Sequence, residues 1–286
     1  MIPRIHFEAL VQLTERQFCL KEEPNRRIYD ELCNLGYADK DGVTKRGKEI
    51  LERFRAKRAV FIAAGMGTRL KPITINTPKP LVRVQGVRII DRLIDACLAA
   101  DINDIIIVRG YLGEQFDQLL YKYPMVRFID NTMFTQANNI SSAVLSKEFL
   151  SNAYVFEADL LIRNPSIIRK YHYSSNFLAI KKDASDDWCF RVRNGIIVEE
   201  KVGGLGGDNW QMVGISYWST EDGERLRKDL PEVFSQQDGK NYYWEQVPLV
   251  YRKENYQVEV RSCNEEDIVE IDTFEELKQL DSEYSF

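Results

Sequence analysis

Two glycines and two basic residues form the part of the sequence best suited to chemistry. They follow the apolar segment RAVFIAA at residues 58–64, and they are Gly65, Gly67, Arg69 and Lys79. Glycine has no Cβ, so the backbone there can turn sharply and bring its N–H groups close to an anion. The two basic side chains add positive charge, and prolines on both sides of Lys79 restrict its backbone. The pattern indicates a polyphosphate site.

The loop differs from the two common phosphate-binding motifs. No Gly-Lys-Ser or Gly-Lys-Thr follows these glycines, and the third glycine of the dinucleotide fingerprint is missing. Glycines after a strand can also mark a simple tight turn. However, the whole segment AAGMGTRLKPITINTPKPL resembles the signature of the sugar-phosphate nucleotidyltransferase family. The resemblance implies that the loop wraps the triphosphate of a nucleotide, through Ala64, Gly65, Met66, Gly67, Thr68, Arg69 and Lys79.

Two acidic residues at the ends of predicted strands are candidate metal ligands. Asp159 ends the sequence FEAD, and Asp272 ends VEID. An ionised carboxylate at such a position is costly unless it meets a cation, and Mg²⁺ prefers oxygen ligands. The family resemblance also implies that both aspartates bind Mg²⁺. The alternative is that Asp159 caps a loop and that Asp272 caps a helix predicted over residues 273–280.

Two amide side chains precede another predicted helix. Asn138 and Asn139 could contact the base or ribose of the nucleotide, or they could cap the helix together with Ser141. The residues that read the base lie in this region of the resembling transferases. We therefore expect Asn138 and Asn139 to contact nucleotide.

Aromatic and acidic residues could form a pocket for the second substrate. Trp188 follows two aspartates in SDDWCF, and Tyr243 precedes Glu245 by two positions in NYYWEQ. A quaternary ammonium has no N–H to donate, so proteins recognise it with aromatic ring faces and a nearby carboxylate. The alternative is that these rings only pack in the core, which is what we expect of Trp218.

The order of these segments is similar to that in the bacterial CTP:phosphocholine cytidylyltransferases. NNISS, EAD, DDWCF, VGISYW, YYWE and EID occur in that order within residues 58–286. The resemblance implies that Trp188, Tyr243 and Glu245 frame the choline group. Glu245 stands where that family usually has Asp, which leaves phosphoethanolamine and 2-aminoethylphosphonate as alternative acceptors.

Strands and helices alternate along the larger part of the chain. This alternation predicts an α/β fold with a doubly wound, mostly parallel sheet and substrates at the carboxyl ends of the strands. It resembles the nucleotide-diphospho-sugar transferase fold. FLAIKK, FRVRNGIIVEEK and QMVGISYWS predict a small antiparallel insertion over the acceptor site, with GGLGGD as a turn. The other strands are predicted at 58–64, 104–110, 126–131 and 152–162, and the helices at 87–100, 114–123 and 140–150.

The first part of the chain, residues 1–57, has a different pattern. Three short helical segments with the turn DKDGV resemble a winged-helix module, so we divide the chain into this module and a transferase domain at 58–286. The module holds 12 basic and 10 acidic residues, a net charge of +2, against −7 for the rest. This balance does not favour nucleic acid as a partner, so we expect a structural cap or a dimerisation arm.

Composition indicates the kind of protein and where it is located. The chain has 286 residues, 44% of them hydrophobic and 29% charged, and its five cysteines form no Cys-x-x-Cys pair. No apolar run approaches the length of a membrane helix, so we expect a cytoplasmic protein with no membrane partner. The sequence predicts a Mg²⁺-dependent cytidylyltransferase that uses CTP and a small phosphorylated amine, phosphocholine first. The alternative from another class is a DNA-binding regulator that only senses nucleotide.

Overall fold

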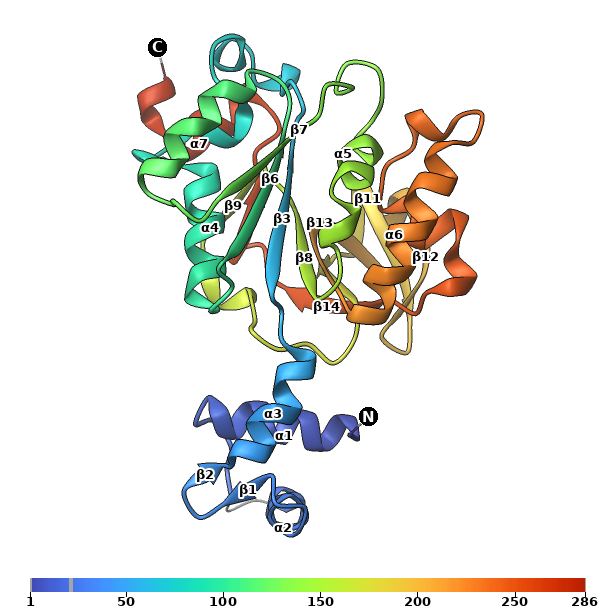
Figure 1. Ribbon diagram of the computed structural model, residues 1–286. Coiled ribbons are helices and arrows are strands. Elements are labelled where there is room, and N and C mark those ends of the chain that lie inside the picture. Colours follow the sequence, from blue (N-terminus) through green and yellow to red (C-terminus); the bar gives the residue numbers. More distant parts are fainter. Residues whose placement is uncertain (1, 21–22, 286) are drawn as a thin grey trace. The chain divides into compact units, whose positions relative to one another are not determined.

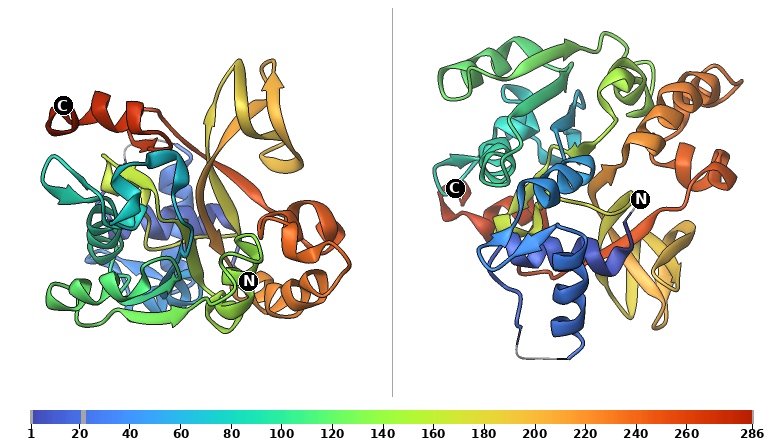
Figure 2. Two further views of the ribbon diagram at one scale, coloured as in Figure 1. Left: turned by 90° about the horizontal axis from the view of Figure 1, so that it is seen from above. Right: turned by 60° about the horizontal axis from the view of Figure 1, so that its bottom comes forward.

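The protein divides into two compact units, which are described separately here (Figures 1 and 2). The structure is a computed structural model that describes residues 2–20 and 23–285. The helical unit takes in the chain up to Ala56 together with Lys170–Tyr173. The sheet unit takes in Lys57–Arg169 and the chain from Ser174 onward.

The helical unit has helices at the three predicted places. They are α1 (Arg4–Thr14), α2 (Asn25–Asn34) and α3 (Lys45–Leu51), and the DKDGV turn joins β1 (Ala38–Asp39) to β2 (Gly42–Val43). The Thr44 side chain caps α3 by accepting a hydrogen bond from the backbone N–H of Gly47. The apolar faces of the helices share one small core, formed by Phe7, Ala9, Leu10, Ile28, Leu32, Ala38, Leu51 and Phe54.

A short segment from the middle of the chain completes this unit. Tyr171 and Tyr173 pack against its core, and the Tyr173 ring lies 5.5 Å from the Phe54 ring in a stacked arrangement. The backbone N–H of His172 donates to the carbonyl of Phe54. No sequence pattern predicts that this segment joins the helical unit, because two tyrosines in a loop have no periodicity.

The sheet unit is built on one mixed sheet. Within the described residues nine strands follow the order β10-β14-β12-β11-β13-β8-β3-β6-β7. Their bounds are β3 (Arg58–Ala63), β6 (Asp104–Arg109), β7 (Arg127–Asp130), β8 (Ala153–Glu157), β10 (Asn176–Lys181), β11 (Ala184–Arg193), β12 (Ile196–Leu205), β13 (Asn209–Trp218) and β14 (Glu259–Cys263).

One half of the sheet is parallel, as the alternating sequence predicts. The strands β8, β3, β6 and β7 pair in parallel, and the apolar runs of β8, β3 and β6 are buried on both faces, whereas β7 is a partly exposed edge strand. Figure 1 shows α4 (Ile89–Ala99) on one side of β3 and β6, and α5 (Ile140–Leu145) and α6 (Thr220–Phe234) on the other. The predicted helix at 114–123 is instead a 3-10 helix, η5 (Gly113–Tyr121).

The other half corrects the predicted topology. The antiparallel strands β11, β12 and β13 are no separate insertion, because β13 pairs with β8 and so continues the main sheet. The sheet is therefore mixed rather than mostly parallel. Part of the expected GGLGGD turn lies inside β12, and the chain turns at 206–208.

A break in the chain creates the edge where the acidic residues gather. The single strand predicted over 152–162 is two strands, β8 and β9 (Leu160–Ile162). The strand β9 leaves the main sheet and pairs antiparallel with β15 (Ile268–Glu270). Asp159 lies at the break, and Asp272 follows the partner strand by two residues. Pairing of Leu160 with Glu270 therefore brings the two aspartates to the same edge.

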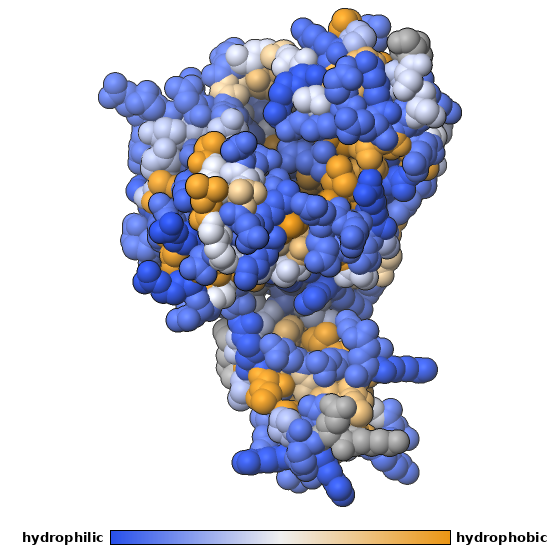
Figure 3. All heavy atoms as spheres, turned by 180° about the vertical axis from the view of Figure 1, so that it is seen from behind, coloured by the Kyte–Doolittle hydropathy of each residue, from blue (hydrophilic) through white to orange (hydrophobic). Residues whose placement is uncertain are grey.

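The core of the sheet unit is packed with aromatic side chains, and the surface in Figure 3 is mainly hydrophilic. Trp218 is fully buried, as expected, and its ring packs edge-on against the ring of Trp244. On the face that Figure 3 presents, hydrophilic residues predominate and hydrophobic atoms lie in small separate groups. Among the described residues, no helix is long and apolar enough to cross a membrane.

Candidate active site

The glycine loop packs closely over a lysine. Gly67 has a left-handed backbone with φ of 57°, and a Cβ added there would lie 2.9 Å from the Cβ of Lys79. Position 67 therefore needs glycine both for its conformation and for this close approach. Gly65 differs, because it has no left-handed φ and a Cβ would meet no atom within 4 Å. The predicted role of glycine in shaping the loop thus falls on Gly67.

Lys79 lies between the two predicted metal ligands. Its side chain is 9% exposed, and its Nζ is 2.7 Å from Asp159 Oδ2 and 3.0 Å from Asp272 Oδ1. Burial alone would lower the pKa of Lys79, but the charges of Asp159 and then Asp272 outweigh it and raise the pKa. The lysine is therefore a charged ammonium that contacts both carboxylates at once.

Arg69 also contacts Asp272. Its Nη2 lies 2.7 Å from Asp272 Oδ1, and its side chain is 67% exposed. The alternative role of Asp272 as a helix cap is wrong, because Thr273 caps α7 (Phe274–Leu280) in a capping box with Glu276. The Asp272 side chain therefore pairs with Arg69 and Lys79 instead of capping the helix.

These residues line a cavity at the carboxyl end of β3. The cavity holds about 270 Å³. Its walls come from the glycine loop, the lysine segment and both aspartates, namely Ile62, Ala63, Gly65, Gly67, Thr68, Arg69, Lys79, Pro80, Ala158, Asp159 and Asp272. Backbone amides, two cations and two carboxylates in one cavity can bind a phosphorylated ligand together with a metal ion.

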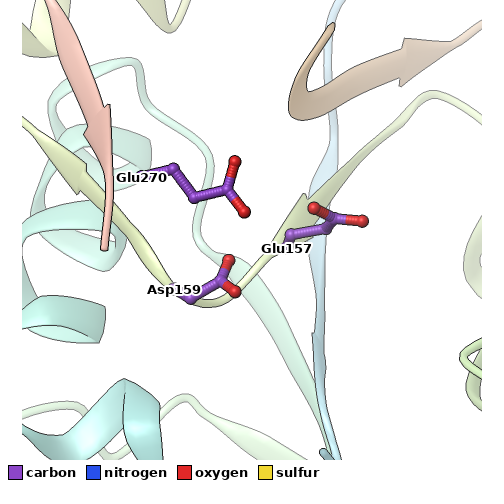
Figure 4. A group of neighbouring side chains, drawn as sticks. All are labelled: Glu157, Asp159 and Glu270. Carbon is purple, nitrogen blue, oxygen red and sulfur yellow. The ribbon is translucent and has the colours of Figure 1, made fainter. Parts of the chain in front are cut away.

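A group of three carboxylates adjoins this cavity (Figure 4). One oxygen each of Glu157, Asp159 and Glu270 lies within 4.8 Å of the others. In Figure 4 the carboxylates of Asp159 and Glu270 lie near each other, with Glu157 beside them. Burial first, then the charge of Asp159, raises the pKa of Glu270 to about 9. Burial and then the charge of Glu245 raise the pKa of Glu157 well above its usual value. Burial and nearby negative charges make the ionised forms of these carboxylates costly, and a bound cation would offset that cost.

The sequence analysis missed Glu157 and Glu270, although both have a signal. Each stands two residues before one of the predicted ligands, in EAD and EID, where alternation turns residues i and i+2 to one side. Gly214 on β13 makes room for Glu157, since a Cβ at that position would lie 2.4 Å from Glu157 Oε2. The packing therefore fixes where this carboxylate lies.

The donor set fits a hard divalent cation such as Mg²⁺. All the candidate ligands are carboxylate oxygens, and Asp159 Oδ1 is buried with no hydrogen-bond partner among the residues that the structure describes. The Lys79 ammonium reaches Asp159 and Asp272 at once, so a single cation between them can contact both. The predicted pair is thus close enough to share a cation, although the group of three contains Asp159 and not Asp272.

The predicted aromatic pair is also brought together. The rings of Trp188 on β11 and Tyr243 lie 5.4 Å apart at an interplanar angle of 64°. Tyr243 is 37% exposed, whereas Trp244 beside it is buried in the core. Trp188 and Tyr243 therefore form an edge-to-face pair that is open to a ligand on part of its surface.

Glu245 is the acid of this acceptor region. It is 2% exposed, and its Oε2 has no hydrogen-bond partner among the described residues. Burial first, then the charge of Glu200, raises the pKa of Glu245 to about 8. Glu245 also raises the pKa of Glu157, so it acts electrostatically on the group of three carboxylates. The predicted acceptor region therefore lies near enough to the three carboxylates for their charges to interact.

Asn138 and Asn139 hold this acceptor segment in place. The Asn138 side chain donates to the carbonyl of Asn241, and Asn139 Oδ1 accepts from the backbone N–H of Trp244 at 2.8 Å. Asn139 also forms a hydrogen bond with Glu245. Neither amide makes the capping bond considered as the alternative, since no side chain caps α5. Their predicted contact with nucleotide stays a prediction.

A second cavity lies on the other side of Asp272. It holds about 320 Å³, and neither cavity is lined by Trp188, Tyr243 or Glu245. Its walls are Leu160, Ile180, Lys182, Asp187, Gln211, Met212, Val213, Glu265, Ile268, Val269, Glu270, Asp272 and Glu276. Asp272 thus borders both cavities, whereas Asp159 lines only the first and Glu270 only the second.

Comparison with known proteins agrees with this geometry. The family model described as nucleotidyl transferase matches residues 58–193. The 2-aminoethylphosphonate cytidylyltransferase of Lancefieldella rimae is 33% identical over 80% of this chain and 93% of its own length. The choline-phosphate cytidylyltransferase of Streptococcus pneumoniae is 33% identical over 78% of this chain and 96% of its own length.

A solved structure extends the comparison to three dimensions. The CTP:phosphocholine cytidylyltransferase of Streptococcus pneumoniae superposes with a TM-score of 0.72 at 30% identity, covering 79% of this chain and 97% of that chain. The matched family region, residues 58–193, begins at β3 and so leaves the helical unit's first 56 residues outside it.

Proposed function

This chain belongs to the nucleotidyl transferase family, and we propose that it transfers the cytidylyl group of CTP to phosphocholine, giving CDP-choline and pyrophosphate. One observation carries the choice of acceptor. The Trp188 and Tyr243 rings lie 5.4 Å apart, and Glu245, two residues after Tyr243, has a buried carboxylate oxygen without a hydrogen-bond partner among the described residues. Aromatic faces and a desolvated negative charge together suit a trimethylammonium group.

The reaction needs positioning more than covalent chemistry. A phosphate oxygen of the acceptor attacks the α-phosphorus of CTP in line, the bond to the bridging oxygen breaks, and pyrophosphate leaves. Lys79 and Arg69 are the cations of the glycine-loop cavity, and they would contact the phosphates as negative charge builds up. The backbone amides around Gly67 would hold the leaving phosphates.

Mg²⁺ would be held at the carboxylate edge. Asp159 and Asp272 are the proposed ligands, with Glu157 and Glu270 within reach, since a single ammonium already contacts both aspartates and the other two acids have raised pKa values. When bound, the ion supplies Lewis-acid charge to the phosphates. The role of this chain's residues is to fix that ion beside the triphosphate.

Two rival functions are less well supported. The relative from Lancefieldella rimae is named for 2-aminoethylphosphonate, which is a primary amine. Its ammonium would donate hydrogen bonds to Glu245, but it would be stabilised less than a trimethylammonium group by two aromatic faces. A regulator that only senses nucleotide would not need Lys79 and Asp159 in contact at 2.7 Å. The intact lysine and aspartate support catalysis.

For the helical unit we propose only a general role. Its three helices and the β1–β2 hairpin support a winged-helix-like module, and its small net charge supports a role as cap or homodimerisation arm rather than as a DNA reader.

A pyrophosphate-release assay tests the proposed reaction. The four nucleoside triphosphates are each combined with phosphocholine, phosphoethanolamine, 2-aminoethylphosphonate and glucose 1-phosphate. We expect CTP with phosphocholine to give the highest kcat/KM. A higher value for either primary amine would overturn the choice of acceptor, and release with no acceptor dependence would overturn the transfer reaction.

A further inference from the structure

Glu200 lies on the same face of a hairpin as the tryptophan of the aromatic pair. In the β11–β12 register Phe190 is opposite Glu200, and Trp188 is opposite Val202. Residues opposite each other share a face, and so do residues two apart along a strand, so Trp188 and Glu200 are diagonal neighbours on one face. Phe190 packs in the core on that face. The Glu200 side chain is therefore directed into the protein beside Trp188.

The charge of Glu200 is not compensated within the protein. Both of its carboxylate oxygens are buried, and neither has a hydrogen-bond partner in the part of the chain that the structure describes. Its neighbour Glu199 is different, because it is 51% exposed and pairs with Arg191 at 3.7 Å. A buried carboxylate without a partner costs free energy, which a bound cation would offset.

Glu200 and Glu245 form a pair of carboxylates. The charge of Glu200 is the second cause, after burial, of the raised pKa of Glu245. Within the described part of the chain Glu245 Oε2 also lacks a hydrogen-bond partner, and the side chain that lowers the pKa of Glu245 is Asn139, which is uncharged. Two acids from different elements thus interact electrostatically, one of them next to Trp188 on the sheet, and no ion pair to either is found among the described residues.

We propose that Glu200 is a specificity-determining residue of the acceptor site, which acts with Glu245 to select acceptors that carry a positive charge. This inference rests on the proposed function. A trimethylammonium group offers no N–H, so hydrogen bonds cannot select it, and its charge must be read through space at low dielectric. Two carboxylates together with two aromatic rings meet that requirement better than one acid alone.

The test compares phosphocholine with neohexyl phosphate, in which a carbon atom replaces the nitrogen and removes the charge without changing the shape. We expect the wild type to prefer phosphocholine. Glu200→Gln should lower kcat/KM for phosphocholine by about tenfold or more and leave both neohexyl phosphate use and KM for CTP unchanged. Glu199→Gln, an exposed neighbour on the same strand, should change none of these values.

The outcomes separate this inference from the proposed function. A Glu200→Gln variant with the wild-type preference for the charged acceptor overturns the inference, and so does an equal loss for both acceptors. A wild type that uses both acceptors equally well overturns the ammonium-recognition part of the proposed function, and the inference with it. The melting temperature checks folding, and Glu200→Leu serves as a second uncharged variant that should show the same loss of discrimination.

Discussion

The nucleotide end and the acceptor end of the site differ in how their charges are balanced. At the nucleotide end Lys79 contacts Asp159 and Asp272, and Arg69 contacts Asp272. At the proposed acceptor end Glu245 and Glu200 have buried carboxylate oxygens with no hydrogen-bond partner among the described residues. At the first end Lys79 and Arg69 can contact the phosphates of an incoming substrate. At the second end a positively charged substrate can supply the cation that the two acids lack. The balance of charge thus indicates which substrate each end binds.

The largest expected effect comes from removing a carboxylate at the nucleotide end. Asp159→Asn keeps the shape of the side chain but loses the charge that holds Lys79 and the proposed Mg²⁺, so turnover should fall below detection while the fold is kept. Pyrophosphate release against Mg²⁺ concentration measures this, with the exposed Asp208→Asn as control. Near-normal activity at low Mg²⁺ would contradict the metal assignment.

Lys79→Ala should have the next largest effect. Loss of one cation beside the reacting phosphates in a closed site should lower kcat by about a hundredfold. Steady-state kinetics measure this, and the exposed Lys122→Ala provides a matched lysine control. If only the KM for the acceptor changed, Lys79 would belong to the acceptor end and the comparison of the two ends would fail.

A smaller effect should appear in the pH dependence of stability. The folded protein keeps a proton on Glu245 up to about pH 8, whereas the unfolded chain releases it near the ordinary pKa of 4.5. The folded state therefore binds more protons in this window, and its stability should fall as pH rises from about 4.5 to 8.

Thermal unfolding in the presence of a chelator measures this decline. Glu245→Gln should make the curve flatter, and the exposed Glu254→Gln should leave it unchanged. Phosphocholine should raise the melting temperature most at the high-pH end, because its ammonium stabilises the ionised acid. A wild-type stability that rises across this window would contradict the account of the acceptor end.

The sequence predicted the nucleotide end better than the acceptor end. Local signals such as Gly67, the prolines around Lys79 and the acids at strand ends identify residues that the structure does bring together. Glu200 and the role of Asn139 had no such signal, because they depend on the pairing of β11 with β12 and on contacts with a segment about a hundred residues away.

The fold shows the same limit. The alternation of strands and helices identified the α/β class, since it depends on local periodicity. It could not show that β13 pairs with β8 and makes the sheet mixed, or that Tyr171 and Tyr173 join the helical unit. Both depend on contacts between distant parts of the chain, which no local pattern encodes.

The most direct test of the acceptor end compares wild type and Trp188→Ala on phosphocholine and phosphoethanolamine at saturating CTP. Desolvated cation–π contacts are worth roughly 2 kcal/mol, so the variant should lose about thirtyfold in kcat/KM for phosphocholine, with little change in KM for CTP. Phosphoethanolamine should lose less, because its ammonium can donate hydrogen bonds to Glu245. Equal losses for the two acceptors, or better use of the primary amine by the wild type, would contradict the assignment.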